Sequence, residues 1–248
     1  MELVLLQKLQ NHLIKDGLSY LNEVLGEMSS ELKVSFKLLK PAEDSWIRVE
    51  VSGDDSEIFS ELIERRFGLA PLQFEKLKVG NIYRGVVTKS GGVGYGIYVD
   101  IGVLSPSPKD ALYPLYAARA QLAEGQKRSI KQIAEQHIMY EGFPLEARLT
   151  ELDVRSGNIE VWLSDRQLDF FLKLGSLPFE RVFIFNVLPN QLQEALRLLE
   201  LRRDVIDVDK LSLTCQLLTC KLGTSAVGVT KKLASKLRQA RIFVYAPS

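Results

Sequence analysis

Hydrophobic and polar residues alternate with a period of two along five short stretches in the middle of the chain. This is the pattern of half-buried β-strands, and clusters of Gly, Pro and Ser separate the stretches as turns. A glycine-rich turn at 91–94 joins the first two stretches into a hairpin. We expect the five strands to close into a small barrel between residues 76 and 165. The predicted strands are 81–89, 95–101, 111–115, 145–152 and 158–163.

Helical and strand-like periods alternate on both sides of this barrel. Before it the order is strand, helix, strand, strand, helix, and we expect 71–74 to supply a fourth strand. After Pro178 the order β-α-β-β-α-β is complete, as in a ferredoxin-like unit. The N-terminal elements are predicted at 3–6, 11–28, 33–39, 46–51 and 55–67. The C-terminal elements are predicted at 181–187, 190–199, 204–211, 213–222, 225–237 and 241–245.

The barrel strands resemble the S1 branch of the OB fold. The residues that carry the resemblance are Gly80, Gly85, the run Gly-Tyr-Gly-Ile-Tyr-Val-Asp-Ile-Gly at 94–102 and Asp-Ala-Leu-Tyr-Pro-Leu at 110–115. Pro114 replaces the histidine of the family pattern, and Ala111 replaces its third-strand glycine. These departures put the usual base contacts of that family in doubt for this chain.

The predicted fold class is therefore α+β, with a central S1-like OB β-barrel flanked by two ferredoxin-like βαββαβ domains. We expect an N-terminal ferredoxin-like domain at 1–75, an S1-like OB-fold domain at 76–175 and a C-terminal ferredoxin-like domain at 176–248. A chain of 248 residues is long enough for two or three such small domains.

The resemblance to one family extends over the whole chain. It rests on GYGIYVDIG, on KDALYPLYAARAQLAEGQ and on RRDVIDVDKLSLTCQLLTCKLGTSAVGV, in which Cys220-Lys221-x-Gly223-Thr224-x-Ala226-x-Gly228 is the most distinctive motif. These segments are similar to the archaeal domain of unknown function DUF2110. The resemblance implies an archaeal, cytoplasmic protein with an S1-like central domain, and it brings no activity with it.

Composition narrows the class of protein. No apolar run approaches the roughly 18 residues that a membrane span needs, and no leader opens the chain, so we expect a cytoplasmic protein without membrane contact. Cys215 and Cys220 lie in an apolar segment and have only His12 and His137 as further soft ligands, which favours buried thiols over a metal site or a disulfide. We expect no cofactor and no metal.

Charge is unevenly distributed although the net charge is only +1. Residues 76–131 hold nine lysines and arginines against three acids, and residues 210–248 hold seven cations and no acid. The segments 1–75 and 132–209 each hold eight cations against 14 acids. Such asymmetry indicates an anionic partner for one face of the molecule, or acidic and basic domains that attract each other.

Aromatic and basic residues of the barrel region suggest RNA binding, because such barrels stack bases on aromatic side chains while cations follow the phosphates. Tyr95 and Tyr98 are three residues apart, so strand alternation places one of them in the core unless a bulge occurs at Gly96. Tyr116 is a further aromatic candidate. The candidate RNA-binding residues are Lys78, Tyr83, Arg84, Lys89, Tyr95, Tyr98, Tyr113, Arg119, Lys127, Arg128, Lys232 and Lys236.

Two glycine-containing segments have alternative interpretations. The turn at 91–96 resembles a nucleotide-binding loop in spacing, but no helix follows it, which favours a β-turn. Gly223-Thr224-Ser225 opens a helix, where either ordinary N-capping or a bound phosphate would satisfy the free N–H groups. His137 lies among polar neighbours in an expected surface segment, and no Ser-His-Asp or Cys-His set has a catalytic context.

The sequence thus favours a non-enzymatic RNA-binding protein, with single-stranded or structured RNA as its partner. Association with the ribosome or with RNA polymerase is an expectation of the same hypothesis. The alternative is a protein–protein adaptor that uses a ferredoxin-like sheet or the acidic N-terminal segment against a basic partner.

Overall fold

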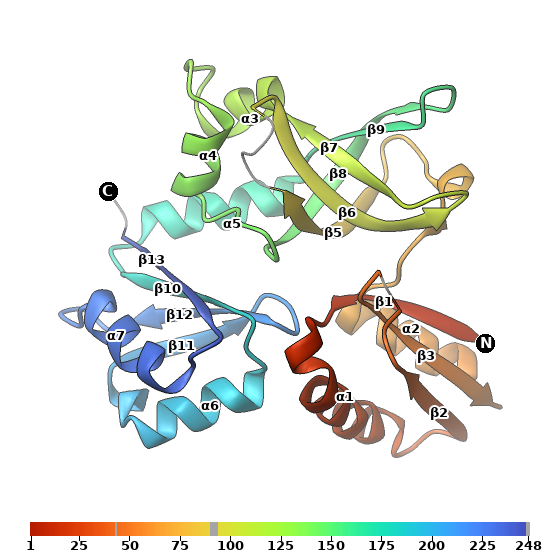
Figure 1. Ribbon diagram of the computed structural model, residues 1–248, viewed down its shortest axis with the longest axis horizontal. Helices are drawn as coiled ribbons and strands as arrows, with labels where there is room; N and C mark the ends of the chain where they lie inside the picture. Colours follow the sequence, from red (N-terminus) through yellow and green to blue (C-terminus); the bar gives the residue numbers. More distant parts are fainter. Residues whose placement is uncertain (43, 90–93, 247–248) are drawn as a thin grey trace.

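The computed structural model describes residues 1–42, 44–89 and 94–246, with the side chain of Lys89 excepted. Three β-sheets organise these residues, and in Figure 1 the barrel lies across the two smaller sheets. Most of the predicted glycine-rich turn at 91–94 falls outside the described residues. Within them, no helix combines the length and the apolar character that crossing a bilayer requires.

The central sheet closes into a five-stranded barrel, which confirms the prediction from the alternating pattern. Strand β5 pairs antiparallel with β6 and β8, β6 with β7, and β8 with β9, while a parallel contact of Leu112 with Glu160 closes β7 on β9. This closure is consistent with an OB-like fold. The strands are β5 (Ile82–Lys89), β6 (Gly96–Ser105), β7 (Lys109–Pro114), β8 (Pro144–Asp153) and β9 (Asn158–Leu163).

Three helices accompany the barrel: α3 (Leu115–Leu122), α4 (Ile130–Gln136) and α5 (Asp165–Ser176). The periodicity of residues 130–136 does not distinguish a helix from a strand. The hydrogen bonds at the N-terminus of α4 favour the helix. The Ser129 hydroxyl accepts a hydrogen bond from the Gln132 N–H, and the Gln132 side chain accepts one from the Ser129 N–H. This reciprocal capping box satisfies two N–H groups that a helix end otherwise leaves free.

The N-terminal unit comprises β1 (Glu2–Lys8), α1 (Ile14–Ser29), β2 (Val34–Leu39), β3 (Trp46–Gly53) and α2 (Ser56–Phe67). Its antiparallel sheet has the order β1-β3-β2. The expectation that 71–74 adds a fourth strand to this sheet is wrong. The short strand β4 (Leu72–Gln73) instead pairs parallel with β6 of the barrel, so it joins the central sheet across the expected boundary at residue 75.

The C-terminal unit comprises β10 (Arg181–Phe185), α6 (Pro189–Leu198), β11 (Val205–Lys210), β12 (Cys215–Cys220), α7 (Ala226–Lys236) and β13 (Arg241–Tyr245). These strands form an antiparallel sheet of order β11-β12-β10-β13. Cys215 and Cys220 are free and buried, as expected, and burial raises the pKa of both thiols. Among the residues that the structure describes, no three His, Cys, Asp or Glu side chains gather as a metal site.

Each flanking sheet has strands that are buried on both faces, because the barrel region packs against the face that the sheet's own helices leave free. In β10, Val182 and Ile184 belong to the cluster formed with α6 and α7, whereas Phe183 and Phe185 belong to the cluster of the barrel and α5. A strand buried on both faces has a continuous apolar sequence rather than an alternating one. Four of the five buried residues of β10 are apolar, and the fifth, Arg181, donates hydrogen bonds to the Leu174 and Phe179 carbonyls.

The N-terminal sheet follows the same rule. Leu3 and Leu5 pack with α1 and α2, whereas Val4 and Leu6 pack with Trp46 toward the barrel. We call this second contact, formed by Val4, Leu6 and Trp46 with Ala70, Leu72, Val86 and Leu104, the sheet–barrel junction. An ion pair of 2.5 Å between Lys8 Nζ and Asp100 Oδ2 borders it.

His137 follows α4 and is partly buried, whereas its polar neighbours in the sequence predict a surface residue. Its ring lies 5.0 Å from that of Phe171, and its Nε2 has no hydrogen-bond partner among the described residues. Burial is the largest cause that lowers the pKa of His137, and the positive charge of Arg128 lowers it further.

This burial predicts a stability that depends on pH. In the unfolded chain the imidazole titrates near pH 6.5, and its pKa in the folded protein is lower. As pH falls from about 7 to about 5, the unfolded state takes up a proton that the folded state resists, so the free energy of unfolding decreases. Urea denaturation of the protein and of His137→Gln measures this. An equal pH slope in both proteins would contradict the assignment.

Candidate nucleic-acid interface

Tyr95 and Tyr98 lie together on the outside of the barrel. Their hydroxyl oxygens are 2.8 Å apart, and their rings meet edge to face with centroids 6.2 Å apart. The expectation that one of them is buried in the core is wrong, because Tyr95 precedes β6, which begins at Gly96, and so lies outside the alternation of that strand. The hydrogen bond between the two hydroxyls is the largest cause that raises the pKa of Tyr98.

A second aromatic pair is formed by Tyr116, an exposed residue at the start of α3, and Trp162 of β9, which is partly buried. Their ring centroids are 6.1 Å apart, and the Tyr116 hydroxyl donates to the carboxylate of Glu160. Trp162 is absent from the candidates taken from the sequence. The alternation of β9 could have identified it, because Ile159, Val161 and Leu163 are buried and therefore leave Trp162 on the outer face.

The register of the barrel connects the two pairs. Tyr98 lies opposite Leu112 of β7, and Leu112 lies opposite Glu160 of β9. Gly96 makes room here, because a Cβ at this position would lie 2.5 Å from Leu112 Cδ1. We call the resulting surface of Tyr95, Tyr98, Leu112, Tyr116 and Trp162 the aromatic face.

Tyr113 does not belong to this surface. It is 0% exposed inside the barrel, where burial strongly raises its pKa, and its hydroxyl has no partner among the described residues. The neighbouring side chains of β7 explain the misassignment. Ala111 and Tyr113 point inward while Leu112 points outward, and three apolar side chains in a row do not distinguish the two faces. A base cannot reach the Tyr113 ring, which corrects the expectation that it binds RNA.

Tyr83 and Arg84 are also engaged elsewhere. The Tyr83 hydroxyl accepts a hydrogen bond of 2.9 Å from the backbone N–H of Lys78, so it fixes the entry into the barrel. Arg84 points to a cleft between the domains, where its Nε lies 3.5 Å from Glu146 Oε2. Lys78 itself is exposed. Lys89 ends β5 opposite Tyr98, and its side chain lies outside the described part.

The remaining predicted cations form two separate groups. Arg119, Lys127 and Arg128 lie in the α3–α4 segment, where Arg119 Nε donates to the Arg128 carbonyl at 2.8 Å. Arg119 is one helical turn beyond Tyr116, so this group adjoins the aromatic face. Lys232 and Lys236 are exposed on α7, in the C-terminal unit. The predicted set is therefore divided among several surfaces.

The helix start at Gly223-Thr224-Ser225 is already satisfied by protein groups. The Ser225 hydroxyl accepts a hydrogen bond from the Gly228 N–H at 3.3 Å. The Glu180 carboxylate accepts another from the Ala226 N–H at 2.6 Å. A carboxylate at this place favours N-capping over the bound phosphate that the sequence leaves open, because the two anions would compete for the same N–H groups.

Three solved structures that are similar to this chain have low sequence identity and low TM-scores. An a/eIF2alpha–aDim2p–rRNA complex from Pyrococcus horikoshii is 19% identical, with 50% of this chain and 60% of that chain covered and a TM-score of 0.28. The alpha subunit of aIF2 from Pyrococcus abyssi is 12% identical, with 68% and 97% covered and a TM-score of 0.26. A multidomain protein with nucleic acid binding domains from Streptococcus pneumoniae is 13% identical, with 82% and 53% covered and a TM-score of 0.21.

This chain thus spans about three fifths of the first of these structures, and none of the three likenesses identifies a function. No curated protein matches the chain. Family models do match it, and they cover most of its length. The DUF2110 central domain matches residues 77–174, which include the whole barrel, and the DUF2110 C-terminal domain matches residues 179–245. The chain therefore belongs to the DUF2110 family.

Proposed function

We propose that this protein binds single-stranded RNA, without catalysis, on the aromatic face of its barrel. The observation that carries the proposal is the two aromatic pairs on the outside of the barrel, Tyr95 with Tyr98 and Tyr116 with Trp162. In each pair one ring is exposed and the other is partly buried. Each ring is held by a neighbour or by a hydrogen bond, so little side-chain freedom is lost when a base stacks on it. Such stacking contributes roughly 1–3 kcal/mol per base and tolerates any sequence.

Basic groups beside the aromatic face suit the phosphates of the same strand. Arg119, Lys127 and Arg128 follow Tyr116 along the α3–α4 segment, and Lys127 is exposed. Acids on the face itself, Glu160 and Asp110, are engaged by the hydroxyls of Tyr116 and Thr88. The strand is therefore expected to place its bases on the barrel and its backbone toward α3.

The topology supports the finer fold assignment within this proposal. The barrel order, with its parallel β7–β9 contact and a helical segment between β7 and β8, suits an S1-like member of the OB fold. The C-terminal order β11-β12-β10-β13 with two helices suits a ferredoxin-like unit. A binding role is also supported by Cys215 and His137, since burial raises the pKa of the enclosed Cys215 thiol and partial burial lowers the pKa of His137.

Substitution of Tyr98 tests the proposal. We expect Tyr98→Ala to raise the Kd for a labelled single-stranded RNA of about 12 nucleotides by roughly 5- to 100-fold, because one stacked base is lost. Tyr98→Phe is the matched control: it keeps the ring and should change the Kd by less than about twofold. Fluorescence anisotropy measures both, with circular dichroism to verify folding. Equal affinity of Tyr98→Ala and the unmodified protein would overturn the proposal.

A further inference from the structure

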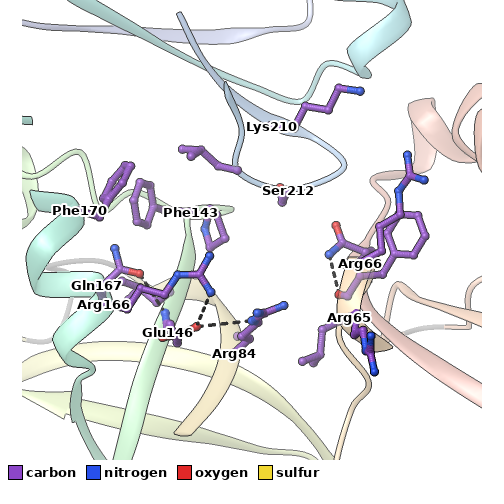
Figure 2. A pocket seen from close by; sticks show the side chains of 17 residues that line it. Arg65, Arg66, Arg84, Phe143, Glu146, Arg166, Gln167, Phe170, Lys210 and Ser212 are labelled. Carbon is purple, nitrogen blue, oxygen red and sulfur yellow. Dashed lines mark hydrogen bonds and ion pairs between the residues drawn. The ribbon is translucent and has the colours of Figure 1, made fainter. Parts of the chain in front are cut away.

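A cleft of about 360 Å³ opens where the three units meet, away from the aromatic face. Figure 2 shows its walls: the end of α2 on one side, β8 and α5 on another, and the turn after β11 above them. Five of its lining side chains are cations from all three units. We call this group the arginine cleft: Arg65, Arg66, Arg84, Arg166 and Lys210.

Among the described residues, Glu146 is the one acid that lines the same cleft. Its carboxylate accepts a hydrogen bond of 2.8 Å from the Ser164 hydroxyl and lies 3.5 Å from Arg84 Nε and 3.7 Å from an Arg166 nitrogen. In Figure 2 the two arginines approach Glu146 from different elements, so it fixes their positions. Arg65 is paired outside the lining, since its guanidinium lies 3.6 Å from Glu61 Oε2. Five cations against Glu146 and Glu61 leave three positive charges in excess. Gathering like charges destabilises the compact state, and an anionic ligand relieves this cost.

The cleft also has an apolar wall. Phe170 and Leu211 lie along it, and the buried Phe143 packs behind Phe170 with ring centroids 6.5 Å apart. The Gln167 side chain also lines the cleft. Its Oε1 atom accepts a hydrogen bond from the Glu146 N–H, so its amide nitrogen remains as a donor for a ligand. A planar apolar surface next to several cations matches a ligand that has both a base and a phosphate.

We propose that the arginine cleft binds a phosphorylated nucleoside, with its phosphate on the cations and its base against Phe170. The cleft volume lies within the range of small-molecule sites, about 300–1,000 Å³. Arginine suits phosphate because its planar group donates two parallel hydrogen bonds. The ligand is either a free nucleotide or the phosphorylated end of an RNA strand. This site shares no residue with the aromatic face, so it does not depend on the RNA-binding proposal.

Isothermal titration calorimetry with ADP, and separately with a 5′-phosphorylated tetranucleotide, tests the proposal on the full chain. We expect Arg166→Ala and Lys210→Ala each to weaken binding about tenfold, because each removes a charge-assisted contact. Both side chains are exposed, so the variants should fold. Arg155→Ala, an exposed arginine in the β8–β9 turn, is the matched control and should bind as the unmodified protein does.

Comparison of ADP with the tetranucleotide distinguishes a free nucleotide from the phosphorylated end of an RNA strand. Tighter binding of ADP assigns a free nucleotide, and tighter binding of the tetranucleotide assigns an RNA end, provided that its 5′-hydroxyl counterpart binds more weakly. Tyr98→Ala should bind ADP normally, so a failure of RNA binding on the aromatic face leaves this result intact. The proposal is overturned if neither ligand binds up to about 1 mM, the weak end of specific affinities. It is equally overturned if the cleft variants bind like Arg155→Ala.

Discussion

Replacing Trp46 by alanine lowers the free energy of unfolding by about 3–5 kcal/mol, the usual cost of removing a fully buried large aromatic side chain. Trp46 is 0% exposed in the sheet–barrel junction, where it packs with Val4 and Leu6. The Lys8 ammonium lies over the Trp46 ring, 4.5 Å from its centroid, and forms an ion pair with Asp100 of the barrel. The truncation therefore removes apolar burial and loosens an ion pair between two units. Urea denaturation, monitored by circular dichroism, measures the loss.

Trp46→Phe is the control for this change. The indole Nε1 has no hydrogen-bond partner among the described residues, so phenylalanine removes a buried unpaired donor along with part of the ring. We expect it to cost distinctly less than alanine, by at least about 1 kcal/mol. A Trp46→Ala variant as stable as the unmodified protein would show that the junction is not packed as described.

Replacing Gly102 by valine is expected to cost about 2–5 kcal/mol, from two separate causes. Gly102 has φ +83°, a region that a β-branched residue adopts only under strain. In addition, a Cβ at this position would lie 2.5 Å from Ala70 Cβ, so the sheet–barrel junction would have to open. The Gly102 N–H donates to Asp100 Oδ1 at 2.8 Å, which orients the carboxylate that binds Lys8.

The two causes can be separated by a second substitution. Ala70→Gly removes the atom nearest to a new Cβ, while Ala70 Cα and Leu6 Cδ2 stay 3.1 Å from it. The double variant should therefore recover part of the steric loss and keep the backbone part. Gly26→Ala is the matched control, because it lies within α1 and a Cβ there meets nothing within 4 Å. It should gain about 0.5–1 kcal/mol from helix propensity. Equal stabilities of Gly102→Val and Gly26→Ala, measured by urea denaturation, would refute this account.

The barrel could be predicted from the sequence because its signal is local. Alternation places Val87, Ile97, Leu145 and Ile159 inside, and each strand contains its own evidence. The destination of β4 could not be predicted, because two residues have no period and their partner lies in a different unit. The same limit holds for the continuous apolar run of β10, which indicates that both faces are covered but does not say by what.

The candidate site was predictable in part. The sequence indicates Tyr95 and Tyr98 as candidates because they are aromatic residues in a predicted barrel hairpin. Their mutual contact could not be predicted, since it depends on where β6 begins. The arginine cleft could not be predicted from the sequence, although Arg84 is among the candidate RNA-binding residues. Its cations come from α2, β5, α5 and the end of β11, and only the packing of three units brings them together. Charge counts along the chain do not contain that information.

Strand β4 links the N-terminal segment to the barrel, close to residue 75, where the sequence predicts a domain boundary. Leu72 pairs with Val103 and Gln73 with Ser105, so the far end of β6 receives its partner from upstream of residue 75. A fragment that starts at residue 77 leaves those backbone groups of β6 uncovered, as an open template for strands of other molecules. We therefore expect a fragment of the central barrel that begins before Leu72 to self-associate less than one that begins at residue 77.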